Sequence, residues 1–185
     1  MAFVSIIELL YLIILVVFVG YIFTGIMKRR DPLHFRGGFD WQDFKLACIV
    51  AAPGILLHEL AHKFTAMGFG LDAAFNIWPF GIFLGVLLKV IGSPFILIAP
   101  GYVNISTLAT NSQMAFIAFA GPFINLLLWL IPSYILNHKK RLTRNQAVVL
   151  YFTKVINMWL FIFNMIPIPP LDGSKVLEGL LSVIF

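Results

Sequence analysis

The sequence predicts an α-helical polytopic membrane protein: a bundle of about four full transmembrane helices plus a partial C-terminal one. Of its 185 residues, 61% are hydrophobic and only 11% are charged, and the mean hydropathy is +0.96. Soluble domains are nearer to roughly 45–50% apolar. Four apolar stretches also reach the length of about 20 residues that a membrane-crossing helix needs. Between the second and third of these, glycines and prolines interrupt the apolar sequence, which predicts a membrane-associated β-hairpin or re-entrant segment.

The first apolar stretch runs from Phe3 to Met27 and contains one acid, Glu8. We expect a transmembrane helix rather than a signal peptide, because the basic cluster Lys28-Arg29-Arg30 follows the apolar residues instead of preceding them. Asp40 then has a side chain that can accept hydrogen bonds from free backbone N–H groups at a helix start. The next helix is therefore expected to begin near Trp41 to Phe44.

The second span is expected from about Phe44 to Met67, where Gly68 and Gly70 are natural terminators. Pro53-Gly54 interrupts it. Proline removes one backbone hydrogen bond and can kink a helix, opening it to water, but membrane helices also tolerate proline without consequence. Both interpretations of Pro53-Gly54 remain open from the sequence.

The stretch from Phe75 to Val103 is mostly apolar but is repeatedly broken by glycine and proline. Isoleucine, valine and phenylalanine are dense on both sides of Gly92-Ser93-Pro94, which favours a re-entrant β-hairpin around that turn or a pair of short broken segments. Because non-helical backbone inside a membrane needs cover from protein or a water-filled cavity, we expect this segment beside the functional site. The competing interpretation is a complete transmembrane helix from Phe80 to Ala99.

The third span is expected from Ser112 to Leu136 and the fourth from about Ala147, with the basic loop 139–144 between them. Short basic clusters beside apolar spans act as topology determinants and lipid headgroup contacts, so the net charge of +5 does not indicate a nucleic-acid partner. Prolines between 167 and 170 end the fourth span. The apolar helix after Lys175 is too short to cross a membrane, and we expect one domain over 1–185 with its core in 44–173.

The sequence His58-Glu59-x-x-His62 lies within the second span. Residues four apart stand on the same face of a helix, so His58 and His62 can hold one metal ion, and the spacing suits zinc. Glu59 follows the first ligand and can serve as a general base without entering the coordination shell. Three ionisable groups within one turn of a membrane helix are costly unless they bind something. We therefore predict one Zn²⁺ per chain.

Asp172 follows the proline-rich end of the fourth span, on backbone expected to be irregular and surrounded by apolar sequence. A carboxylate there is costly unless a metal or a cation receives it, so Asp172 is the predicted third ligand. The alternative is that Asp172 only caps a helix beginning near Ser174. With three protein ligands, zinc keeps a position for water and activates it, and Glu59 can take the proton and return it to a leaving amine.

Three motifs on successive spans carry a resemblance: His58-Glu59-x-x-His62, Gly121-Pro122-x-x-Asn125 and Asn164-x-x-Pro167-x-Pro169-x-Leu171-Asp172-Gly173. In this order they resemble the site-2 protease family of intramembrane zinc metalloproteases. The resemblance implies zinc bound by His58, His62 and Asp172, with Glu59 as the catalytic acid/base. It also implies that Asn164 lies near the substrate or the transition-state oxyanion, and that an edge strand ahead of the third span pairs with an unwound substrate.

The edge strand is expected near Pro100-Gly101-Tyr102-Val103, because Pro100 cannot donate a ladder hydrogen bond and Gly101 has no obstructing side chain. A transmembrane segment that unwinds in lipid needs new backbone partners, which such an edge supplies. The predicted substrate-binding residues are Asn164, Pro100, Gly101, Tyr102, Val103 and Asn125.

Cleavage of peptide bonds within or near transmembrane segments of membrane proteins is the predicted function. Alternatives are a zinc carrier or sensor, and a protease-like protein that binds transmembrane helices without cutting them. Glu59 favours hydrolysis over transport, because a carrier needs ligands but no base beside them. The expected partners are a transmembrane protein substrate and the lipid bilayer of the cell membrane, with no nucleic acid.

Overall fold

The computed structural model describes residues 4–25, 39–93, 100–106 and 108–184. The elements are α1 (Ile6–Phe23), α2 (Trp41–Gly68), β1 (Ala73–Ile77), α3 (Pro79–Val90), β2 (Gly101–Ile105), α4 (Asn111–His138), α5 (Arg144–Asn164) and α6 (Asp172–Ile184). Among these described elements, α1, α2, α4 and α5 are long and apolar enough to cross a membrane. This confirms the prediction of four long apolar helices, and the 13-residue α6 is the short C-terminal one.

The start of α2 agrees with its predicted cap. Asp40 Oδ1 accepts hydrogen bonds from the backbone N–H groups of Gln42 and Asp43, and the helix begins at Trp41. It continues through Pro53 and ends at Gly68, with Gly70 at a φ of 75° in the turn that follows. The metal motif therefore lies in the C-terminal half of one continuous helix.

The first two helices pack closely against each other, and this contact forms the centre of the buried core. Leu15 and Val19 of α1 and Ala47 and Ala51 of α2 are completely inaccessible to solvent. In contrast, side chains such as Ile13 on the outer face of α1 are exposed, as lipid-facing residues are. Burying that contact fixes α1 beside the helix that carries the metal motif.

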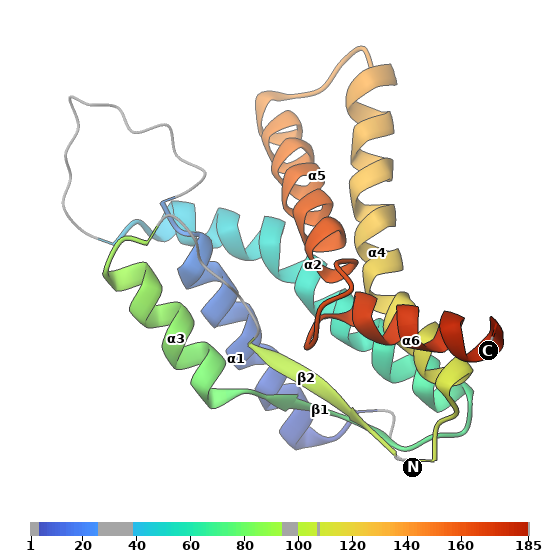
Figure 1. The fold of residues 1–185 in the computed structure, drawn as a ribbon. Coiled ribbons are helices and arrows are strands. Elements are labelled where there is room, and N and C mark those ends of the chain that lie inside the picture. The colour runs from blue at the N-terminus through green and yellow to red at the C-terminus, as the bar shows by residue number, and fades with distance from the viewer. Residues whose placement is uncertain (1–3, 26–38, 94–99, 107, 185) are drawn as a thin grey trace.

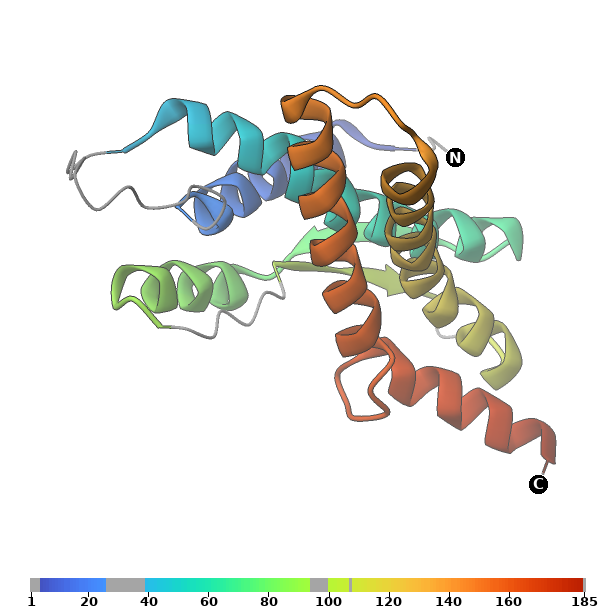
Figure 2. The ribbon, with the colours of Figure 1, turned by 90° about the horizontal axis from the view of Figure 1, so that it is seen from above.

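The polypeptide between α2 and α4 forms a two-stranded antiparallel sheet with a helix inserted between the strands. Phe75 of β1 lies opposite Val103 of β2, and the backbone N–H of Trp78 donates to Pro100 O at 2.8 Å, which extends the pairing by one residue. Figure 1 shows the sheet running alongside α2, and Figure 2 shows α3 beyond one end of the sheet.

The predicted position of the hairpin is wrong. Residues before Gly92-Ser93-Pro94 form α3, which begins with Pro79 in the first turn, where proline's fixed φ favours a helix. The strands are instead the more distant segments β1 and β2. The competing prediction of a transmembrane helix over 80–99 is also wrong in its described part, because α3 ends at Val90 after 12 residues; residues 94–99 lie outside the described part of the chain.

The remaining helices complete the site. α4 packs against α2, α5 and α6, so it stands between the metal motif and the C-terminal part of the chain. The segment after Asn164 turns back, and α6 then begins at Asp172 and packs against α4 (Figure 1). This return brings the predicted third ligand to the first two.

Candidate metal centre

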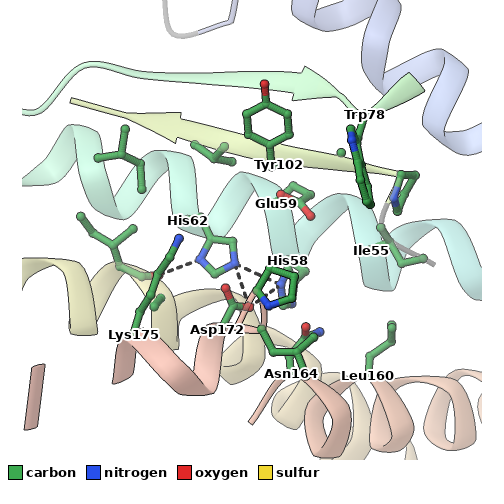
Figure 3. Close-up of a pocket in the computed structure, with 18 of the residues that line it drawn as sticks. Ile55, His58, Glu59, His62, Trp78, Tyr102, Leu160, Asn164, Asp172 and Lys175 are labelled. Carbon is green, nitrogen blue, oxygen red and sulfur yellow. Dashed lines mark hydrogen bonds and ion pairs between the residues drawn. The ribbon is translucent and has the colours of Figure 1, made fainter. Parts of the chain in front are cut away.

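His58 and His62 of α2 and Asp172 of α6 converge, although 114 positions separate His58 from Asp172. His58 Nε2 lies 3.0 Å from His62 Nε2 and 3.1 Å from Asp172 Oδ2, and the His62 Nε2 to Asp172 Oδ2 distance is 3.3 Å (Figure 3). Two imidazole nitrogens and one carboxylate oxygen form a ligand set that zinc uses when it keeps one position open.

The orientation of His58 is fixed from behind by two asparagines. Asn157 Nδ2 donates to Thr153 O at 2.8 Å, and Asn125 Nδ2 donates to Gly54 O at 3.0 Å and to Asn157 Oδ1 at 2.9 Å. Backbone carbonyls only accept, so Asn125 presents its Oδ1 to His58 Nδ1, 2.6 Å away. His58 therefore carries its proton on Nδ1, and its Nε2 lone pair is left for a metal.

His62 is oriented in the same way by the backbone. In the neutral ring, its Nδ1 donates to the carbonyl oxygen of Ile117 on α4 at 2.7 Å, which leaves the Nε2 lone pair for a metal. In these neutral tautomers, two nitrogen lone pairs and a carboxylate oxygen face one another. Such an arrangement is repulsive unless a cation lies among the three atoms, so the residues present fit a metal ion.

The Gly-Pro-x-x-Asn motif on α4 supports both histidines. A Cβ atom built on Gly121 would lie 2.7 Å from His58 Nε2 and 2.6 Å from His62 Cε1, so only glycine lets α4 approach the two rings this closely. Asn125, one turn further along α4, accepts the hydrogen bond from His58 Nδ1. The spacing of the motif thus matches the spacing of the ligands on α2.

A cavity of about 590 Å³ opens beside these ligands. Glu59 lines it from α2, and residues 101–103 of β2 line the facing wall (Figure 3).

The register of the sheet determines which backbone groups of β2 point to its free edge. Trp78 pairs with Pro100, and Ser106 N donates to Asp72 O, so Tyr102 and Asn104 also bond to β1. In an antiparallel ladder the alternate residues, including Val103, direct their N–H and C=O groups to the free edge.

The predicted substrate-binding residues divide into two groups. Pro100, Gly101, Tyr102, Val103 and Asn164 all line the cavity. Asn125 does not line it: the residue is completely buried behind His58 and is occupied by three hydrogen bonds. Its Oδ1 is the hydrogen-bond partner of His58.

Several residues of the site were missed from the sequence. Trp78, Ile55 and Leu160 line one end of the cavity and Lys175 the other (Figure 3). Trp78 reaches the site only through the long-range pairing of β1 with β2. Asn157 could have been identified from the sequence, because a polar amide within an apolar span is energetically costly unless it finds hydrogen-bond partners.

Comparison with known proteins agrees with this geometry. The model of Peptidase family M50 matches residues 132–185. Over 141 residues the chain is 36% identical to "Putative zinc metalloprotease MJ0611" of Methanocaldococcus jannaschii, an alignment that covers 73% of this chain and 70% of that protein. It is 29% identical over 140 residues to "Putative zinc metalloprotease YwhC" of Bacillus subtilis, covering 67% and 64% of the two chains.

A third relative is longer. The chain is 25% identical over 134 residues to "Zinc metalloprotease MJ0392" of Methanocaldococcus jannaschii, covering 72% of this chain and 34% of that protein. No solved structure matches the chain.

Proposed function

Because the chain belongs to peptidase family M50, the site-2 protease family of intramembrane zinc metalloproteases, we propose that it cleaves peptide bonds within or near transmembrane segments of membrane proteins in the cell membrane. It is a zinc metalloprotease and an integral membrane protein. The observation that carries the proposal is the convergence of three metal-ligand side chains and a carboxylate on a cavity whose opposite wall is a strand edge. We regard residues 1–185 as one protease domain with its core in 44–173.

The proposed ligands are His58 Nε2, His62 Nε2 and Asp172 Oδ2, one Zn²⁺ per chain. Support comes from their mutual distances of 3.0 to 3.3 Å and from the two Nδ1 hydrogen bonds, which in neutral rings leave both Nε2 lone pairs for a metal. When bound, zinc supplies a Lewis acid that polarises the scissile carbonyl and makes water a nucleophile at neutral pH.

Glu59 is the proposed general base and acid. It follows His58 directly on α2 and lines the cavity that the substrate enters. Its carboxylate takes the proton from the attacking water and then returns that proton to the leaving amine, so one group serves both halves of amide hydrolysis. Asn164 at the end of α5 lines the same cavity, and its side-chain amide can donate to the oxyanion that forms on the scissile carbonyl.

The proposed substrate-binding element is the free edge of β2, with Pro100, Gly101, Tyr102 and Val103 at the cavity. One edge of β2 is paired with β1, so only the other edge can accept a further strand. A helical peptide bond is shielded by its own hydrogen bonds, and unwinding it in lipid leaves backbone groups without partners. Strand addition at β2 satisfies those groups while the cleaved bond faces Glu59.

Incubation of the purified protein with a transmembrane substrate tests this proposal. The parent protein is expected to release two fragments, a zinc chelator to stop the reaction, and added zinc to restore it. A protein that holds one zinc per chain and binds the substrate without cutting it would instead be a helix-binding protein. Zinc exchange without any substrate binding would favour a carrier or sensor.

A further inference from the structure

One buried carboxylate joins three elements away from the metal ligands. Glu8 of α1 is 6% exposed and forms an ion pair with Lys63 of α2, which is 3% exposed. Glu8 Oε1 also accepts a hydrogen bond from the backbone N–H of Phe75 in β1 at 2.8 Å, and Oε2 accepts one from the N–H of Ser5 at 2.8 Å. We call Glu8, Lys63 and Phe75 the Glu8 junction.

The Glu8 junction connects the proposed ligands to the proposed substrate edge. Lys63 directly follows His62, so its backbone moves with the metal-binding turn of α2. Phe75 lies opposite Val103 in the sheet, and its own N–H points away from β2 to Glu8. The outer edge of β1 is thus bonded to Glu8 at Phe75, while the outer edge of β2 faces the cavity.

We propose that Glu8 and Lys63 are positioning residues that set the distance between the metal-binding helix and the substrate-binding strand. An unwound substrate bound to β2 then presents one peptide bond to Glu59 rather than a range of neighbouring bonds. This inference rests on the proposed protease function.

Two physical arguments favour positioning over plain stabilisation. A buried ion pair adds little stability compared with apolar side chains of similar volume, so packing α1 against α2 does not require it. A two-stranded sheet is also marginal alone, and its position depends on what holds it from outside. The Glu8 junction supplies a directional bond to the sheet backbone, which an apolar contact cannot supply.

The double variant Glu8→Gln/Lys63→Met tests the ion pair that links α1 to α2. It removes both charges, so no unpaired charge is left buried, and it keeps a side-chain oxygen for the Phe75 N–H. Lys63→Met alone is the second variant, because the Glu8 carboxylate keeps its two backbone donors. The matched control is Lys89→Met: Lys89 Nζ donates to the carbonyl oxygens of Ile22 and Thr24 at the other end of α1, far along the chain from the metal-binding turn of α2.

Two readouts are needed. Mass spectrometry of the products identifies which bond is cut, and spin labels at Phe64 and Tyr102 in a Cys48→Ser background measure the distance between α2 and β2 without any cleavage. In both junction variants we expect parent zinc content, a broader distance distribution, turnover lowered about tenfold and cuts at neighbouring bonds, because small misplacement of a reacting bond is costly. Lys89→Met should match the parent.

A parent-like distance distribution and a single parent cut in the zinc-loaded variants would overturn the inference. Loss of zinc from both variants would also overturn it, because the pair would then hold the site together rather than space it. A parent that cuts no substrate, with distances that still broaden in the variants, would refute the proposed function and leave the positioning of the sheet intact.

Discussion

The two walls of the cavity are built differently. On the metal wall, His58 and His62 are both buried, and each donates a hydrogen bond from its Nδ1 to an oxygen atom of α4. On the substrate wall, β2 is a five-residue strand whose residues alternate between half-buried and exposed, and Tyr102 is 51% exposed. The positions of the two histidine rings are fixed by several side-chain contacts, while the position of β2 depends on its backbone pairing with β1 and on the Glu8 junction.

This difference matches the proposed tasks of the two walls, which are metal binding and substrate binding. Metal ligands must hold their geometry without a substrate, and hydrogen bonds behind the ligands provide that. A strand edge recognises backbone and tolerates varied side chains, so it suits a substrate whose defining property is that it unwinds. Substitutions of the proposed ligands and of their hydrogen-bond partners should therefore change zinc content, and substitutions on the substrate wall should change cleavage alone.

The largest effect is expected from removing a ligand. Asp172→Ala and His58→Ala each delete one of three proposed zinc ligands, so purified protein should lose most of its zinc and all detectable cleavage. Metal analysis by mass spectrometry checks this. Full zinc occupancy in Asp172→Ala would assign the third ligand to another residue.

A smaller effect on the same wall is expected from Asn157→Ala. It removes the acceptor that helps to orient Asn125, which in turn fixes His58. Zinc affinity should fall about tenfold, as for other hydrogen-bond partners behind metal ligands. Competition with a zinc chelator measures this affinity, and Asn145→Ala at the exposed start of α5 is the control. Equal zinc affinity in the two variants would show that Asn157 does not contribute to the metal site.

On the substrate wall, Val103→Pro removes a backbone donor that points to the free edge of β2. Cleavage should fall while zinc content stays at the parent level, because the metal wall is untouched. Val103→Ala keeps the N–H and is the control. Parent activity in Val103→Pro, together with no crosslink from Val103 to the substrate, would remove β2 from the mechanism.

The smallest effect is expected from Trp78→Ala. Trp78 is 41% exposed at the end of the cavity that Ile55 and Leu160 also line, so it offers apolar contact to a substrate side chain. We expect a several-fold rise in KM with little change in kcat, since this contact forms equally with bound substrate and transition state. Trp159→Ala, on the exposed face of α5 outside the cavity, should leave both unchanged.

The metal wall could be predicted from the sequence because its signals are local. His58 and His62 share a helix face by spacing alone, and Gly121 and Asn125 carry the matching spacing on α4. Asp172 was found by the cost of an isolated carboxylate in apolar surroundings. The hydrogen bond between Asn125 and His58 could not be predicted, because a motif gives a helix position but not the direction in which its side chain points.

The substrate wall could not be predicted in the same way. The apolar residues of α3 fit a strand or a short helix equally well, since short apolar runs carry no decisive periodicity. The actual strands, β1 and β2, pair across an inserted helix, and no local signal specifies that pairing. The ion pair of Glu8 with Lys63 likewise joins residues 55 positions apart.

In the proposed mechanism, Glu59 is the general base beside a zinc ion whose binding does not depend on Glu59. Zinc content and turnover of Glu59→Gln, measured on the same purified sample, test this most directly. We expect one zinc per chain and turnover lowered by about a hundredfold or more, because the ligands survive while the proton acceptor is lost. One zinc per chain with turnover within about tenfold of the parent would contradict the assignment, since loss of a general base costs more than that.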